Sequence, residues 1–410
     1  MSVSHKPHNE FVDTKNAAVT CLPVETGCGS AALLLECAAQ VEQPMETVLS
    51  RMGAMRRVLA RTFKVRVVPV FAGLVWLCVR TTVSFFMALD PLFFGRLRRT
   101  KVKAPIVLVG QPRSGTTFLQ RFLCDQNYGA GLEVWRMLYA SLTIQFFLKP
   151  ILPLLEIVAP TRWHKTKAHD TSLTSVETDD AGVLLRNLDG FFLYGFFLAF
   201  DEQDHFMQFA PEVRDTSKRD FDWLNALWRR SLVAHKHDTV IAKVFSLSTR
   251  TPQFLQRFPD ARILYMARDP LNTIPSVMSL VTGVLENAFG FWKLSPELKS
   301  RWFQRLYHGL VELHLRFVAD WDNGKIDKNR VFIVRYDRMM ADFEGMMDEM
   351  NKFLGVTPND AQRKAIAEQG QKQRAYSSDH AYNLKKFELD ESAIRRDCAK
   401  FYEAFLPPLN

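Results

Sequence analysis

The feature that most constrains this chain is a short loop, GQPRSGTT, which runs from Gly110 to Thr117. The apolar run before it, APIVLVG (104–110), predicts a buried strand, and TTFLQRFLCD (116–125) has the pattern of a helix. Where a strand enters a helix through such a loop, free backbone N–H groups converge with the helix N-terminus and bind anions. The sequence therefore predicts an anion-binding site at residues 110–117.

Three further runs share the continuous hydrophobicity of the first, at 238–244, 261–267 and 330–336 (DTVIAKV, ARILYMA and RVFIVRY). Continuous runs of this kind are typical of parallel strands that are covered on both faces. Helical patterns lie between the runs. We therefore expect an α/β fold, three-layered and P-loop-like, with a parallel central sheet and a largely helical insertion at about residues 127–237.

Composition narrows the class of protein further. Of the 410 residues, 47% are hydrophobic and 24% charged, which excludes a disordered chain or a small disulfide scaffold. The net charge of +9 fits an anionic ligand or an acidic membrane surface better than nucleic acid, which we do not expect as a partner. The six cysteines form no CxxC pair and no zinc-spaced cluster with histidine, so we expect no metal.

The N-terminal part divides into two expected segments before the main domain (104–410). Residues 1–60 form an extension without a signal peptide, and residues 61–103 form an apolar and basic helical segment. The run VVPVFAGLVWLCV (67–79) is too short to span a bilayer, and lengthening it to Leu89 would place Arg80 near its middle. We expect a helix at a membrane surface, with a helix buried against the main domain as the alternative.

The loop at 110–117 differs from that of nucleotide triphosphatases in one residue. Thr116 stands where the P-loop lysine, which reaches the β- and γ-phosphates, would follow the second glycine. Its absence argues against an ATPase or GTPase. Arg113 can supply the cation instead, because its planar guanidinium suits an anion with several oxygens. Thr116 and Thr117 add hydroxyl donors at the first helical turn.

The string PRSGTTFL resembles the 5′-phosphosulfate loop of sulfotransferases that use 3′-phosphoadenylyl sulfate (PAPS), in the branch where arginine replaces the usual loop lysine. The resemblance implies that the donor is bound by Arg113, Ser114, Gly115, Thr116 and Thr117.

A second segment, FPDARILYMARDPLNTIPSVMSL (258–280), resembles the segment with which the same family binds the 3′-phosphate. The resemblance assigns that role to Arg268, at a strand end, and to Ser276, eight residues on. Taken alone, the segment also fits an ordinary strand–turn–helix with a surface arginine. A weaker match at 330–340 places Tyr336 near the adenine.

The same resemblance suggests the residues of the chemical step. Lys243 matches a lysine that the family places near the bridging oxygen of the donor, although a solvated lysine at a strand end is an equal alternative. For the general base we favour Glu133, twenty residues after Arg113. Other candidates lie in AHDTSLTSVETDD (168–180) and are His169, Glu177, Asp179 and Asp180.

The predicted function is sulfuryl transfer from PAPS to a hydroxyl or amine of an acceptor, without a metal. Two Phe- and Leu-rich stretches of the insertion, 141–160 and 190–200, favour a hydrophobic small molecule or lipid, including a lipid-linked sugar, over a charged glycan. The alternatives are a kinase-like phosphate-loop enzyme and a non-catalytic scaffold at a membrane. Both a membrane-associated and a cytoplasmic location remain open.

Overall fold

The computed structural model describes residues 45–158, 172–375 and 383–407. The N-terminal extension is expected to end after residue 60. That boundary falls inside helix α2 (Val48–Thr62). Ala54 and Val58 of α2 are buried in the main hydrophobic core, so this helix is part of the main domain.

Four parallel strands form one sheet in the order β2–β1–β3–β4. They are β1 (Ile106–Gly110), β2 (Ile241–Lys243), β3 (Arg262–Ala267) and β4 (Val331–Arg335). Each lies within one of the four predicted runs, which confirms the parallel α/β fold. From β1 the chain continues to β2 on one side, and from β3 it continues to β4 on the other side. In sheets of this kind, ligands bind at the carboxyl ends of the two neighbouring strands whose connections run in opposite directions, which here are β1 and β3.

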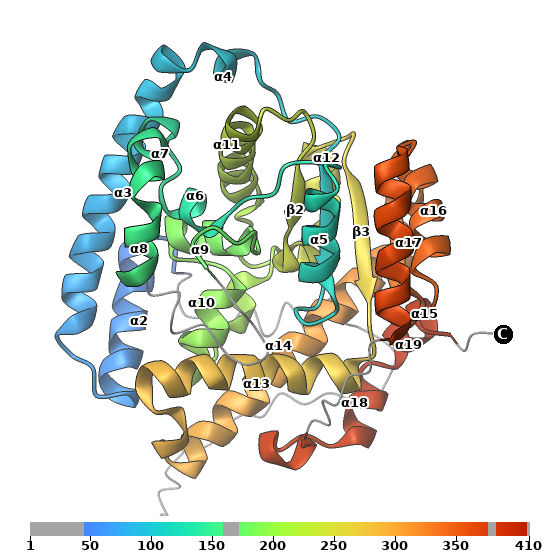
Figure 1. Cartoon of the computed structure of the whole chain (residues 1–410). Helices are drawn as coiled ribbons and strands as arrows, with labels where there is room; N and C mark the ends of the chain where they lie inside the picture. Colours follow the sequence, from blue (N-terminus) through green and yellow to red (C-terminus); the bar gives the residue numbers. More distant parts are fainter. Residues whose placement is uncertain (1–44, 159–171, 376–382, 408–410) are drawn as a thin grey trace, which may run out of the picture. The chain divides into compact units, whose positions relative to one another are not determined.

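Each face of the sheet packs into its own hydrophobic core, which gives three layers. Val107 and Val109 of β1 belong to one core, which includes side chains from α11, α12, α13 and α14. Ile106 and Leu108 belong to the other, with side chains from α5, α16 and α17. Because neighbouring side chains of a strand point to opposite faces, each continuous apolar strand serves both cores. Figure 1 shows α16 and α17 side by side, to the right of β3.

Most of the remaining chain is helical. Before the sheet lie α3 (Val68–Phe93) and α4 (Gly95–Arg99); α5 (Thr116–Asp125) follows β1. The insertion contains α6 (Val134–Leu138), α7 (Leu142–Leu148), η1 (Lys149–Ile151), α8 (Leu152–Val158), α9 (Asp180–Asn187), α10 (Phe191–Phe196), η3 (Leu198–Phe200), η4 (Phe206–Phe209) and α11 (Ser217–His235), where η denotes a 3-10 helix. The largely helical insertion is therefore confirmed.

Helices also connect and follow the last strands. Between β2 and β4 lie η5 (Phe245–Thr249), α12 (Thr251–Arg257), α13 (Pro270–Phe289), η6 (Phe291–Lys293), α14 (Pro296–Asp322) and η7 (Lys328–Arg330). After β4 lie α15 (Tyr336–Ala341), α16 (Phe343–Leu354), α17 (Asp360–Ala375), η8 (Leu384–Phe387), α18 (Glu391–Asp397) and α19 (Ala399–Phe405).

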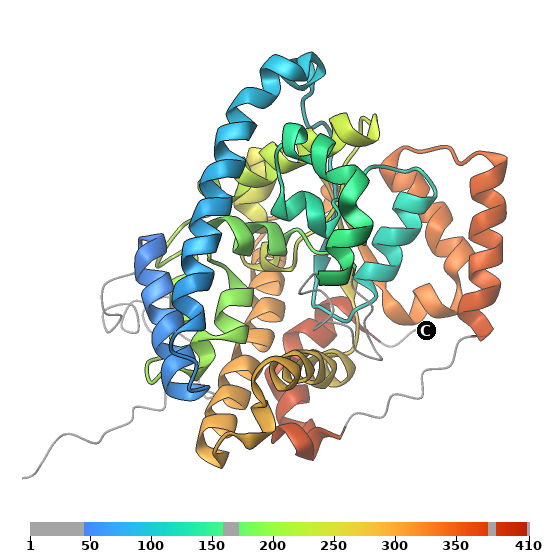
Figure 2. The same cartoon turned by 60° about the vertical axis from the view of Figure 1, so that its left-hand side comes forward.

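Helix α3 runs along the side of the domain and packs against α7 (Figure 2). Among the described residues it is the helix that is long and apolar enough to cross a membrane, and the mean hydropathy of its most apolar 18 residues is 1.7. Only 6% of these residues are buried. The alternative of a buried helix is therefore wrong: α3 is packed on one side only.

Candidate active site

The loop after β1 folds as a cradle that two glycines make possible. Gly110 has φ +132°, and a Cβ there would come within 2.6 Å of the Met266 carbonyl oxygen on β3. Gly115 has φ +91°, and a Cβ there would lie 2.7 Å from Cε of Met339 and 3.2 Å from the ring of Tyr336. Only glycine tolerates both this backbone and this crowding. Gly115 is also the N-cap of α5 and provides no side-chain cap, so backbone N–H groups of the first turn remain for a ligand.

The two predicted phosphate segments meet at this loop. Nε of Arg113 donates to Oγ of Ser276 at 3.0 Å, and Arg268 donates to the carbonyl oxygen of Arg113 at 2.7 Å. The Arg268 guanidinium lies 3.9 Å from the ring centroid of Tyr336, a cation–π contact. Residues from β1, β3 and β4 thus converge at one edge of the sheet, as their sequence positions predict.

Two other loop residues have structural partners. Ser114 is buried, and its hydroxyl donates to the carbonyl oxygen of Gln111 at 2.7 Å, which closes the loop on itself. Thr116 is buried at the start of α5. Their backbone N–H groups, more than their side chains, are therefore the groups that these positions offer to an anion.

Lys243 reaches the same helix end from β2. It is buried, and its Nζ donates to Oγ1 of Thr117 at 2.8 Å. Glu177 lies 3.6 Å from the same Nζ. Burial lowers the pKa of Lys243, and the carboxylate of Glu177 opposes that shift. The alternative of a solvated lysine at a strand end is therefore wrong.

Glu177 connects this lysine to helix α5. Its carboxylate accepts a hydrogen bond from Arg121 at 2.9 Å, besides its contact with Lys243. Arg121 was not singled out from the sequence. It follows Thr117 by four residues, a spacing that places both side chains on one face of a helix, and this signal could have found it.

Glu133 has different partners. Its carboxylate pairs with Arg136 at 2.7 Å and with His235 at 3.1 Å. Burial raises the pKa of Glu133, but the hydrogen bond from His235 and the charge of Arg136 outweigh it and hold the pKa below the usual value. The backbones of Glu133 and Val176 form an isolated antiparallel β-bridge, and Glu177 follows Val176 in the sequence. Neighbouring side chains of extended segments point to opposite sides, so Glu133 points away from Glu177.

The other predicted acids hold the backbone. Asp179 accepts hydrogen bonds from Nε1 of Trp228 and from the backbone N–H of Lys243. Asp180 accepts from the backbone N–H groups of Phe245 and Ser246. Burial raises the pKa of both carboxyls, that of Asp179 to about 7. They fix the end of β2 that carries the lysine. His169 lies outside the described residues.

This arrangement defines a class: an α/β domain with a loop of the anion-binding type at the carboxyl edge of a parallel sheet and without a P-loop lysine. The particular family follows from comparison. The sulfotransferase family matches residues 105–360, so the chain belongs to the sulfotransferase family and is an enzyme that transfers sulfuryl groups. This excludes the kinase-like and scaffold alternatives. The family implies PAPS as the donor.

Individual relatives agree with this membership. The omega-hydroxy-beta-dihydromenaquinone-9 sulfotransferase Stf3 of Mycobacterium bovis and of Mycobacterium tuberculosis is 25% identical over 309 residues, which cover 73% of this chain and 74% of the relative. Among solved structures, sulfotransferase STF9 from Mycobacterium avium has a TM-score of 0.66 at 16% identity, over 92% of this chain and 97% of its own. Sulfotransferase STF1 from Mycobacterium tuberculosis H37Rv has a TM-score of 0.60 at 16% identity, over 90% and 98%.

Metal ligands were not expected from the sequence. Within the part of the chain that the structure describes, no three His, Cys, Asp or Glu side chains gather as a metal site. The expectation that the reaction needs no metal stays a prediction.

Proposed function

We propose that this enzyme transfers the sulfuryl group of PAPS to the hydroxyl of a hydrophobic acceptor, a lipid or small molecule. One observation carries the donor assignment: Arg113, Arg268 and Ser276 meet beside the uncapped N-terminus of α5. A donor with a phosphosulfate at one end and a 3′-phosphate at the other needs two such anion-binding segments. Both segments are present and hydrogen-bonded to each other.

The residues divide the binding of this donor among them. The N–H groups of residues 114–117 and the Arg113 guanidinium hold the phosphosulfate, and Arg268 with Ser276 holds the 3′-phosphate. Tyr336 lies against Gly115 and beneath Arg268, where its ring can stack on the adenine. The glycine contacts fit this assignment, because a Cβ at Gly110 or Gly115 would fill the cradle.

The chemical step breaks the S–O bond to the leaving phosphate and forms an S–O bond to the acceptor oxygen, whose proton passes to a base. Protonated Lys243, held by Thr117 at the start of α5, stabilises the negative charge that develops on the leaving oxygen. We assign the base to Glu177, because it lies 3.6 Å from Nζ of Lys243 at the start of α5, whereas the partners of Glu133 are Arg136 and His235, away from that lysine. The leaving product is adenosine 3′,5′-bisphosphate.

The hydrophobic acceptor is supported by the Phe- and Leu-rich insertion and by the relative of 25% identity, which is named as a sulfotransferase of an omega-hydroxylated dihydromenaquinone. The direct test supplies ³⁵S-labelled PAPS with a prenylated quinone that carries a terminal hydroxyl. The matched control is the same quinone without the hydroxyl. We expect label only in the hydroxylated lipid, and about 10²-fold slower labelling with Lys243→Met. Labelling of charged glycans but not of lipid alcohols would overturn the acceptor class.

A further inference from the structure

The outward face of α3 is largely apolar, with Thr81 and Thr82 as its exposed polar residues, and the Thr81 hydroxyl donates to the backbone carbonyl oxygen of Leu77. Its exposed large apolar side chains are 46% to 68% exposed, among them Phe71, Leu74, Val75, Phe85, Leu92 and Phe93. Between Val67 and Phe93 no exposed position of α3 carries a charge. A soluble monomer rarely exposes a contiguous apolar surface of this length, so something covers it.

Helices α7 and α8 extend the same surface. Phe146 and Phe147 at the end of α7, and Leu154 and Ile157 on α8, are 67% to 71% exposed. Helix α7 packs against α3, and α8 follows α7 after the short 3-10 helix η1 (Figure 1). We call the exposed apolar side chains of α3, α7 and α8 the apolar face.

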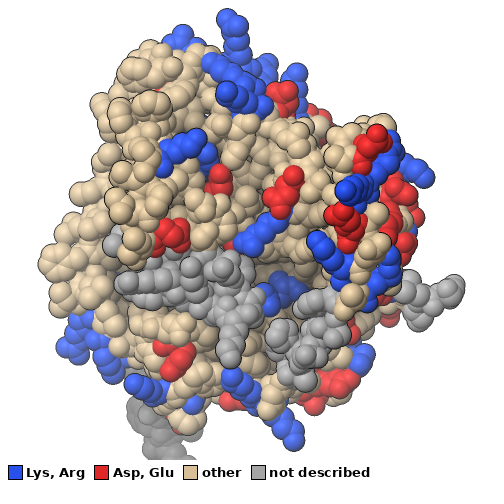
Figure 3. Space-filling view, in the orientation of Figure 1, with Lys and Arg blue, Asp and Glu red and all other residues tan. Residues whose placement is uncertain are grey.

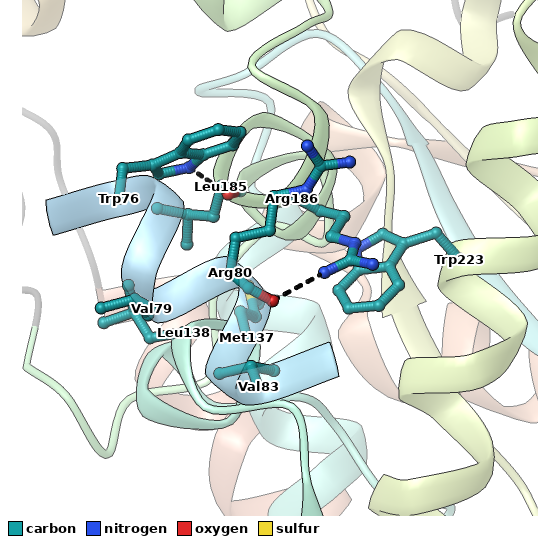
Figure 4. Close-up of a pocket in the computed structure, with 9 residues that line it drawn as sticks. All are labelled: Trp76, Val79, Arg80, Val83, Met137, Leu138, Leu185, Arg186 and Trp223. Carbon is teal, nitrogen blue, oxygen red and sulfur yellow. Dashed lines mark hydrogen bonds between the residues drawn. The ribbon is translucent and has the colours of Figure 1, made fainter. Parts of the chain in front are cut away.

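The charged residues of α3 lie on its other side, toward the domain. Arg80 lies 5.2 Å from the ring centroid of Trp76 and lines a small cavity with Arg186 and Trp223 (Figure 4). Asp90 is fully buried. It accepts hydrogen bonds from Arg230 of α11 and from the start of α7, at Ser141, Leu142 and Thr143. These hydrogen bonds hold α3 and α7 together, so the two helices present their apolar sides as one surface.

Basic residues flank the apolar face at both ends of α3. Arg61, Lys64 and Arg66 are exposed before it, and Arg96, Arg98 and Arg99 are exposed after it. Figure 3 shows this edge of the domain in tan, with blue groups at its upper end and near its lower end. An apolar surface with cations at both ends complements a bilayer whose headgroups are anionic.

We propose that the apolar face inserts in plane into the surface of an anionic phospholipid bilayer, with α3 parallel to the membrane. A helix that crossed the bilayer would have to leave the domain. It would lose the hydrogen bonds that Trp76 donates to Leu185, at 2.7 Å, and that Arg230 donates to Asp90, at 2.8 Å. It would also take Arg80 and Asp90 into hydrocarbon, at roughly 2.5–3.5 kcal/mol each. This inference does not depend on the donor or acceptor of the proposed function.

The first test is flotation of the full chain with vesicles of phosphatidylcholine, with and without phosphatidylserine. We expect binding to the anionic vesicles that weakens as salt rises. Leu74→Asp with Phe146→Asp should weaken it by about tenfold or more, because each loses the transfer energy of a large apolar side chain. Gln304→Asp, at an exposed position of α14, is the matched control and should bind as the wild type does. Retained thermal melting and bisphosphate binding show that the variants are folded.

The second test distinguishes lying on the membrane from crossing it. The exposed thiol of Cys78 lies in the apolar face and should lose its reaction with a membrane-impermeant maleimide when vesicles are added. Lys64→Cys and Lys101→Cys, at the two ends, should both stay reactive from the same side, as read by peptide mass spectrometry. Protection of one end only would show a span and overturn the proposal. A dimer in solution that Leu74→Asp separates, with no vesicle binding, would show that a second copy covers the face and would also overturn it.

Discussion

Nε of Arg113 donates a hydrogen bond to Oγ of Ser276 at 3.0 Å, although 163 residues separate the two in the sequence. Arg113 belongs to the loop after β1, and Ser276 to helix α13 after β3. The bond joins two anion-binding segments that the sequence predicts separately. The two segments proposed to bind the donor thus lie together as one unit at the junction of two neighbouring parallel strands.

Lys243 should act in the reaction rather than in donor binding. Lys243→Met keeps the buried volume and removes the charge that stabilises the leaving oxygen. We expect kcat to fall about 10²-fold or more, by analogy with the loss of one oxyanion donor, while the Kd for adenosine 3′,5′-bisphosphate changes little. Because burial lowers the pKa of Lys243, wild-type activity should fall as the pH rises through a value below that of an ordinary lysine. Steady-state measurements of kcat across pH test this. If Lys243→Met showed the same fall of kcat at high pH as the wild type, the assignment would be contradicted.

The two glutamates form a matched pair for assigning the base. We expect Glu177→Gln to lower kcat by roughly 10²-fold or more, since a positioned base contributes about that much. Glu133→Gln should keep most of the activity, because its carboxylate is engaged by Arg136 and His235. The family resemblance of the sequence predicts instead that Glu133 is the base. Single-turnover rates with saturating donor decide between the two, and a large loss in Glu133→Gln alone would return the role to Glu133.

Gly115 should be required for the donor and not only for the fold. Gly115→Ala places a Cβ 2.7 Å from Met339 at φ +91°, so the loop must shift. Gly324→Ala is the control, because Gly324 also has a positive φ, +67°, but a Cβ there meets nothing within 4 Å. Both variants should lose about 1–2 kcal/mol of stability from the left-handed backbone. Only Gly115→Ala should also weaken bisphosphate binding, by about tenfold or more, in isothermal titration.

Asp189 should make folding sensitive to acid. It is buried among Arg51, Arg214 and Arg219. Burial alone would raise the pKa of Asp189, but the hydrogen bonds and charges of these arginines lower it to about 2. The unfolded chain takes up this proton at a higher pH, so the stabilisation is present above about pH 4 and is lost as the pH falls toward 2.

Asp189→Asn should therefore lose about 3 kcal/mol at neutral pH, since three guanidinium groups lose their carboxylate. Its free energy of unfolding should then fall by about 2 kcal/mol less than that of the wild type between pH 4 and pH 2. Asp222→Asn, at a half-exposed surface pair with Lys218 and Arg257, is the control and should change stability by less than about 1 kcal/mol. Urea titrations at each pH measure this. If the free energies of unfolding of the wild type and of Asp189→Asn fell by the same amount between pH 4 and pH 2, the account would be contradicted.

The sequence was most informative where local pattern determines structure. All four strands follow from short continuous apolar runs, because a parallel strand covered on both faces needs no polar residue. The phosphate loop follows from Gly110 and Gly115, because only glycine fits the backbone there. Arg268 follows from its place at a strand end. These features depend on neighbours in sequence, and a single chain displays them directly.

It was least informative where a side chain depends on distant partners. Glu133 and its partner His235 both lie in the insertion, and Glu177 of the insertion pairs with Lys243 after it; no local pattern predicts how this insertion folds. Arg80 counted against a membrane helix because its direction was unknown. Trp76, Val83 and Asp90, all on the inner side of α3, share its helical spacing, and this periodicity was the signal that places Arg80 toward the domain.

The donor site is the central claim, and isothermal titration of the full chain with adenosine 3′,5′-bisphosphate tests it most directly. ATP is the parallel ligand, and Arg268→Ala is the matched variant. We predict that the bisphosphate binds much more tightly than ATP and that Arg268→Ala weakens its binding by about a hundredfold, as expected for the loss of a charged hydrogen-bond donor to phosphate. Preference for ATP, or equal binding by the variant, would contradict the account.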